Sequence, residues 1–126
     1  MVELLIGLAA AAILLSSAVP TFSSVVHKNR VSAATTQLYV SLNTARSEAL
    51  KRRGAVTVCP TFNDHSCRND GIWSEGWLVF HDANGNNAPQ PDEMIQVIED
   101  LDGEIDIQVS TALSEFIEFQ ASGAVT

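Results

Sequence analysis

The chain has 126 residues and a formal net charge of −8. This length suits one compact domain with an appendage and excludes two full domains. Six of the seven Lys and Arg residues precede Gly54, whereas 13 of the 15 acidic residues follow it and Arg68 is the only Lys or Arg beside them. So acidic a C-terminal part disfavours DNA binding, which depends on Lys and Arg to neutralise phosphates.

Residues 4–22 form an uncharged apolar segment at the N-terminus. Its length is about what a helix needs to cross the hydrocarbon core of a bilayer, so we expect residues 1–23 to be a transmembrane helix. A secretory signal peptide is the alternative, with Ala18 as part of a cleavage site. Signal peptides begin with a basic region and have a shorter apolar core, whereas this segment begins with an acid.

Glu3 is the acid at the start of this segment. A carboxylate inside an apolar segment is costly unless it is neutralised or paired, so Glu3 needs a partner. The alternative is that Glu3 lies at the level of the lipid headgroups, where the dipole of the helix start favours a negative charge.

The helix is expected to continue beyond the membrane segment to about residue 53. Pro20 predicts a kink, because proline lacks the backbone N–H and disfavours a helical conformation at Val19. Gly54 predicts the end of the helix, because glycine readily adopts the left-handed conformation. Between them, apolar residues at spacings of four, three and four form a stripe that needs a covering domain: Leu38, Leu42, Ala45 and Ala49.

After Gly54 the hydrophobic period changes to two, which predicts a small antiparallel sheet covered by the apolar stripe. The expected strands are residues 55–59, 77–80, 94–97, 105–109 and 116–119. Trp73 and Trp77 are expected to add buried area at the edge of this core.

Cys59 and Cys67 lie close together in a polar stretch, which favours a short disulfide-closed loop in an oxidising compartment. His65 lies between them, so a metal site and reduced thiols are the alternatives. Zinc normally has four ligands, and this stretch offers only three.

The segment 82–87 has the composition of a turn. Counting from Asp82, oxygen-bearing side chains stand at positions 1, 3, 5, 9 and 12, a spacing close to that of an EF-hand calcium loop: Asp82, Asn84, Asn86, Gln90 and Glu93. Position 6 is Asn87 where the EF-hand has glycine, and strands flank the segment. A plain loop is therefore the alternative, and calcium is the one cofactor that the sequence suggests.

Several segments carry a family resemblance. Residues 1–8 and 18–22 look like the signature shared by all pilins, and residues 42–49, 56–60, 76–80 and 82–86 follow an order typical of one subset. The chain thus resembles the minor type IV pilins of the T and U fimbrial types and the H-type pseudopilins of general secretion.

This resemblance implies a pilin-like α+β fold, in which the helix and a small antiparallel sheet form a periplasmic domain over residues 24–126. It also implies a structural subunit, anchored in the bacterial inner membrane, that helps to assemble or prime a type IV pilus or a type II secretion pseudopilus. Residues 1–23 would contact other major and minor pilins in the filament core. Glu3 would pair with the free N-terminal amine of a neighbouring subunit.

Relatives are made with a short leader and carry a methylated N-terminal Phe. Neither is present here, so we expect that Met1 is not the mature start. Relatives also continue past the equivalent of Gly123, so we expect further C-terminal strands to be missing.

The sequence supports two other functions less well. Some T-type relatives bind DNA through a basic tail, and a pilus-tip DNA-binding subunit in natural transformation is the alternative function. No matching tail is present in this sequence. A solvated helix end is a better interpretation than a phosphate contact for Lys51, Arg52 and Arg53. No enzyme is expected, because His27, His65 and His81 stand apart without a nucleophile motif or a paired-carboxylate setting.

Overall fold

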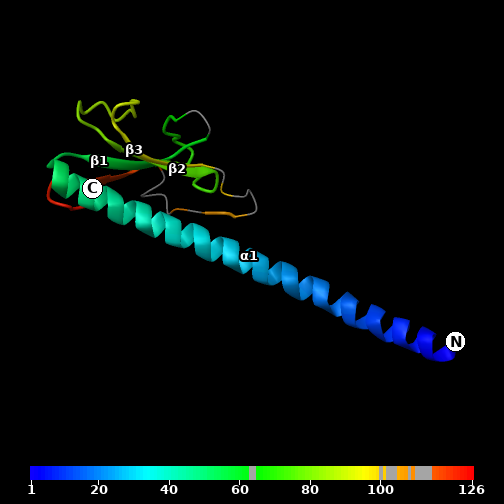
Figure 1. The fold of residues 1–126 in the computed structure, drawn as a ribbon. Coiled ribbons are helices and arrows are strands. Elements are labelled where there is room, and N and C mark those ends of the chain that lie inside the picture. The colour runs from blue at the N-terminus through cyan, green and yellow to red at the C-terminus, as the bar shows by residue number, and fades with distance from the viewer. Residues whose placement is uncertain (63–64, 100, 102–104, 108, 110–114) are drawn as a thin grey trace. The chain divides into compact units, whose positions relative to one another are not determined.

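A computed structural model describes residues 1–62, 65–99, 101, 105–107, 109 and 115–126 (Figure 1). Side chains are described for these residues except 18–21. The described elements are α1 (Val2–Arg52), β1 (Val56–Pro60), β2 (Gly76–His81), β3 (Met94–Glu99) and β4 (Ile117–Phe119). The expected α+β fold is confirmed. The chain forms two compact units, Met1–Ala33 and Ala34–Thr126.

The first unit consists of the N-terminal part of α1. Its described apolar side chains are largely exposed, for example Leu8 at 67% and Leu14 at 71% of their full accessible surface. The kink predicted at Pro20 falls within residues 18–21, outside the described side chains, and stays a prediction.

In the second unit, one face of α1 packs against the sheet. Ala45 and Ala49 are fully buried there, and Leu38 and Leu42 are half-buried against the same cluster. The predicted apolar stripe is therefore confirmed. Ser41 is also fully buried, and such small side chains allow a helix to lie close to a sheet.

Helix α1 ends one residue before the predicted position, through a Schellman-type cap. Arg53 adopts the left-handed conformation (φ 53°), and the Gly54 N–H donates to the Ala49 carbonyl at 3.3 Å. The prediction that Gly54 supplies the left-handed residue is wrong. Gly54 instead leaves room for the His81 ring, because a Cβ there would lie 2.4 Å from Nε2 of His81 and this side chain would have to shift.

The four strands form one antiparallel sheet in the order β3-β2-β1-β4. Val58 in β1 pairs with Val79 of β2 on one side and with Ile117 of β4 on the other. The central strands β1 and β2 are buried on both faces. One face carries the core shared with α1, and the other carries a smaller cluster of Cys59, Leu78 and Phe80, which the sequence did not predict.

Two further expectations need correction. The described residues of the predicted strand 105–109 are not in a strand, although Ile105 is buried and Ile107 packs against the core shared with α1. Their alternation therefore reflects burial without sheet pairing. Trp73 and Trp77 are fully buried members of the same core and do not lie at its edge.

Candidate functional site

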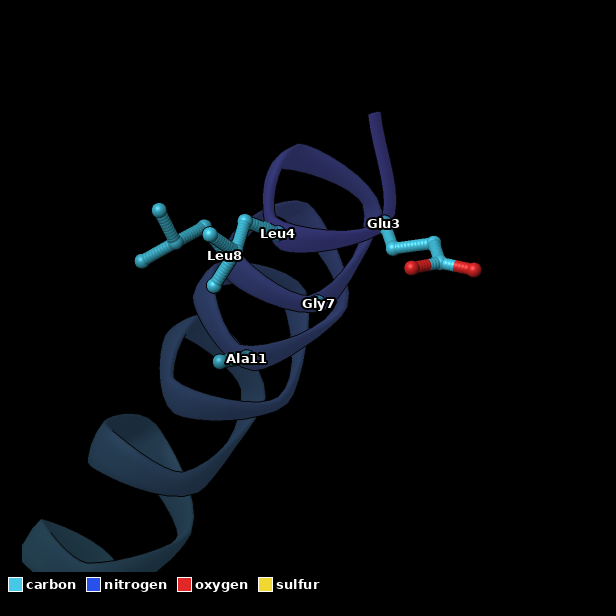
Figure 2. A pocket seen from close by; sticks show the side chains of 5 residues that line it. All are labelled: Glu3, Leu4, Gly7, Leu8 and Ala11. Atoms are coloured by element: carbon cyan, nitrogen blue, oxygen red, sulfur yellow. The ribbon is translucent and has the colours of Figure 1, made fainter. Parts of the chain in front are cut away.

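The first candidate site is the N-terminal face, which we define as Glu3, Leu4, Gly7, Leu8 and Ala11. These residues line a shallow hollow on the first turns of α1 (Figure 2). Space is open beside Gly7, which has no side chain, because a Cβ there would meet nothing within 4 Å. Small residues at this spacing let two helices approach closely in an apolar medium. The N-terminal face can therefore receive a neighbouring helix.

Glu3 is the charged group of the N-terminal face. Figure 2 shows its carboxylate pointing away from Leu4 and Leu8. Within the described part of the chain, the Glu3 carboxylate has no hydrogen-bond or ion-pair partner. In an apolar environment such a partner is energetically important.

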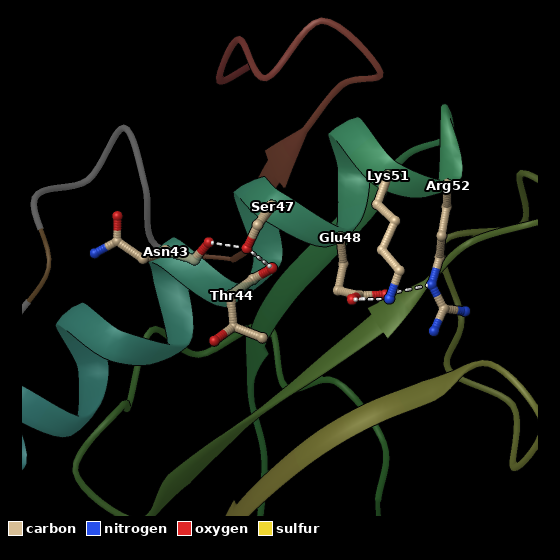
Figure 3. A network of polar contacts seen from close by, with 6 residues as sticks. All are labelled: Asn43, Thr44, Ser47, Glu48, Lys51 and Arg52. Atoms are coloured by element: carbon tan, nitrogen blue, oxygen red, sulfur yellow. Dashed lines mark hydrogen bonds and ion pairs between the residues drawn. The ribbon is translucent and has the colours of Figure 1, made fainter.

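A polar network covers the exposed side of α1 near its C-terminal end (Figure 3). Glu48 accepts hydrogen bonds from Nε of Arg52 at 2.6 Å and from Nζ of Lys51 at 3.2 Å. Arg52, and secondly Lys51, lower the pKa of the Glu48 carboxyl. One turn earlier, the Ser47 hydroxyl donates to the Asn43 carbonyl at 2.7 Å. The two cations are thus paired with an acid of the same helix.

A disulfide joins Cys59 at the end of β1 to Cys67 in the following loop, with the two Cα atoms 5.5 Å apart. Because the two sulfur atoms are bonded to each other, neither is a thiolate that could bind a metal. The metal alternative for this loop is therefore wrong. His65 instead faces Glu99, with 3.3 Å between Nε2 and Oε1.

Arg68 follows the disulfide loop and forms ion pairs with two acids of the next turn. Its Nε donates to Oδ2 of Asp70 at 2.9 Å, and its Nη1 donates to Glu75. The guanidinium lowers the pKa of the Asp70 carboxyl, and Asp70 in turn raises the pKa of Arg68. As the only Lys or Arg after Gly54, Arg68 is occupied by acids of its own chain.

The second candidate site is the acidic loop, residues 82–93, between β2 and β3. Its two ends meet, because Oε1 of Glu93 accepts a hydrogen bond from Nδ2 of Asn84 at 3.2 Å. The Asn86 N–H donates to Asp82 at 3.1 Å and to Asn84 at 3.0 Å. Hydrogen bonds within the loop thus join four of the five oxygen-bearing residues singled out by spacing: Asp82, Asn84, Asn86 and Glu93.

The three histidines lie on separate elements: His27 on α1, His65 in the disulfide loop and His81 at the end of β2. Across the described residues, no three or more His, Cys, Asp or Glu side chains form a cluster suited to a metal ion. A cation in the acidic loop would therefore rely on amide oxygens as well as the buried carboxylates of Asp82 and Glu93. Sequence reasoning missed the hollow at Gly7, which the small residues Gly7 and Ala11 at a spacing of four could have indicated.

Comparison with protein families gives one match. The model of a family described as type II transport protein GspH matches residues 34–126. The matched range coincides with the whole second unit. No curated protein and no solved structure matches the chain.

Proposed function

Since the chain belongs to the GspH family of type II transport proteins, we propose that it is a pseudopilin, a structural subunit that assembles with other pilin-like subunits into the filament of a type II secretion system. Members of this family are structural subunits and not enzymes. The finer role that we propose is assembly or priming of the filament. A type IV pilus is the other filament that would use such a subunit.

The observation that carries this proposal is the exposed apolar surface of α1 in the first unit. Residues such as Leu5, Ile6 and Ile13 expose about two-thirds of their surface, far more than a stable soluble chain tolerates in one continuous patch. By length and composition, α1 is suited to one membrane crossing. A membrane can hold this surface before assembly, and the helices of other subunits can cover it afterwards.

Glu3 would favour one axial position of a subunit in the filament over the others. A carboxylate in an apolar helix bundle is stabilised where it meets a positive charge and is costly elsewhere. The free N-terminal amine of a neighbouring subunit would provide that charge. We propose that this pairing selects the correct axial position of each new subunit.

The Cys59–Cys67 disulfide supports a location for the second unit. Disulfides persist in oxidising compartments such as the bacterial periplasm. Together with the apolar helix, this favours a single-pass protein of the inner membrane whose second unit faces the periplasm.

The pilus-tip DNA-binding alternative gains no comparable support. Lys51, Arg52 and Arg68 are all in ion pairs with acids of the same chain, so contact with a phosphate would first have to break these pairs.

The proposal is tested with Glu3→Ala in cells that carry the complete set of pilin-like subunits. We expect the variant to enter sheared filaments at a level reduced about tenfold or more, because one lost charge pair in an apolar setting costs at least about 1.4 kcal/mol. Thermal unfolding of the second unit should not change, because Glu3 has no partner among the described residues. The measurement is the amount of the chain in the filament fraction relative to the membrane fraction.

Glu48→Ala is the matched control, because it removes the same charge from the other end of α1. We expect it to enter filaments like the parent. Normal incorporation of Glu3→Ala would contradict the role of Glu3. Co-purification with secretion subunits or with pilus subunits identifies the host filament.

A further inference from the structure

The acidic loop is organised around the carboxylate of Asp82. This side chain is 7% exposed. Its Oδ1 accepts hydrogen bonds from the backbone N–H groups of Gly85 at 2.8 Å and Asn86 at 3.1 Å, and its Oδ2 accepts from Asn87 at 2.9 Å. The loop is thereby curled around its first residue.

The departure at position 6 leaves the backbone of the loop unaffected. An EF-hand loop has glycine there because the chain must make a sharp turn. Asn87 occupies this position with φ 56°, in the left-handed region that glycine and asparagine adopt most readily. Asparagine in place of glycine at position 6 is therefore compatible with the left-handed conformation of this residue.

Glu93, the last residue of the loop, provides an independent observation. It is 6% exposed, and its Oε1 accepts hydrogen bonds from the N–H of Ala83 and from Nδ2 of Asn84, both at 3.2 Å. The carboxylate thus points into the start of the loop. Its Oε2 is buried and has no hydrogen-bond partner among the described residues.

A buried carboxylate oxygen without a partner is costly, and a bound cation would remove that cost. Calcium takes six to eight oxygen ligands in flexible geometry, including carboxylates, amide oxygens and waters. Magnesium demands a near-ideal octahedron and usually keeps several waters. The buried carboxylates of Asp82 and Glu93 carry a formal charge of −2, which matches a divalent ion.

We propose that the acidic loop binds a calcium ion through side-chain oxygens of Asp82, Asn84, Asn86 and Glu93. Gln90 stands at the position that often acts through a water. With only two carboxylates, the dissociation constant should be about 10⁻⁴–10⁻³ M, the range of extracellular calcium modules. This proposal is independent of the filament role, so either can fail without the other.

The test uses the full chain in detergent micelles. The protein is first stripped of bound metal with a chelator and is then dialysed into about 0.1 M NaCl, an ionic strength close to the physiological one. Isothermal titration with CaCl2 should give one saturable site. Addition of about 10 mM CaCl2, some 10 to 100 times the expected dissociation constant, should raise the Tm of the second unit by several degrees. MgCl2 at the same concentration should give a clearly smaller shift.

Glu93→Gln should lower the calcium affinity at least tenfold. In the absence of calcium it should be at least as stable as the parent, because it removes a buried charge with an unpartnered oxygen. A purely structural Glu93 would give the opposite result. Asp92→Asn is the matched control, since Asp92 is the adjacent exposed carboxylate, and it should bind calcium like the parent.

Three outcomes would overturn the proposal. They are no saturable binding in the parent, equal binding in Glu93→Gln, and an equal loss in Asp92→Asn. The last would mean that calcium merely screens the acidic surface.

Discussion

Gly76, at the start of β2, lies where the backbone of β3 approaches closely. Its φ is 140°, and a Cβ at this position would lie 2.3 Å from the carbonyl oxygen of Ile98 in β3. The obstacle is backbone that is held by strand pairing, so it cannot turn aside as a side chain can. Glycine is therefore required here on both conformational and steric grounds.

We expect Gly76→Ala to lower the free energy of unfolding by about 2–4 kcal/mol, the combined cost of backbone strain and overpacking. Gly85→Ala is the matched control, because Gly85 also has a positive φ (73°) but open space around its Cβ. It should cost about 1–2 kcal/mol. Urea denaturation with chelator present measures both, and equal losses would show that the contact with Ile98 adds nothing.

The sequence predicted correctly where the chain turns. It did not predict which residue at the turn adopts the left-handed conformation. Gly54 marked the end of the helix correctly, yet Arg53 adopts the left-handed conformation and Gly54 makes room for His81. The oxygen spacing of the acidic loop came from sequence. The burial of Glu93 and its unpartnered oxygen did not, because they depend on how the strands bring the loop ends together.

Among the elements, the disulfide loop ties the end of β1 to a segment outside the sheet. The closed loop is short, with a sequence separation of 8 between Cys59 and Cys67. Cys59 also belongs to the smaller core on the face of the sheet that α1 does not cover. The bond therefore restrains Cys67, which packs against this smaller core.

We expect Cys67→Ser to destabilise the second unit by about 2–3 kcal/mol, the entropy of closing a loop of this length in the unfolded chain. Reductant should destabilise the parent by a similar amount and should leave Cys67→Ser unchanged. Urea unfolding with and without reductant measures this effect. If reductant does not move the midpoint of the parent, the bond contributes no stability.

The period of the apolar residues predicted most helices and strands correctly. It failed where side chains are buried but the backbone is not paired in a sheet. The stripe on α1 and the segments of β1, β2 and β3 were predicted correctly within about two residues at each end. Residues 105–109 alternate like a strand, yet Ile107 and Val109 pack against the core without being part of a strand. A period of two reports which side chains are buried and does not report which backbone groups are paired.

At the scale of the whole molecule, the two units differ in how they are stabilised. Every buried core residue among those described lies at or after Ala34. The first unit has no core of its own and relies on its surroundings. The acidic residues of the chain also gather almost entirely in the second unit, where they favour solubility.

We therefore expect a chain shortened to residues 34–126 to remain folded and soluble without detergent. Its Tm should agree with that of the second unit of the full chain in micelles within a few degrees, about the effect of 1 kcal/mol. Circular dichroism and size-exclusion chromatography test this. An unfolded or aggregated shortened chain would show that the first unit contributes to the stability of the second.

The short connection between α1 and β1 has a mechanical consequence. Only residues 53–55 separate the capped helix from a strand that is hydrogen-bonded on both sides, to β2 and to β4. A pulling force along the end of α1 would enter the sheet through β1, and both of its ladders would resist together. The strand that receives the load is thus one of the two central strands of the sheet. A subunit built in this way can bear tension along its helix without its sheet being unzipped from an edge.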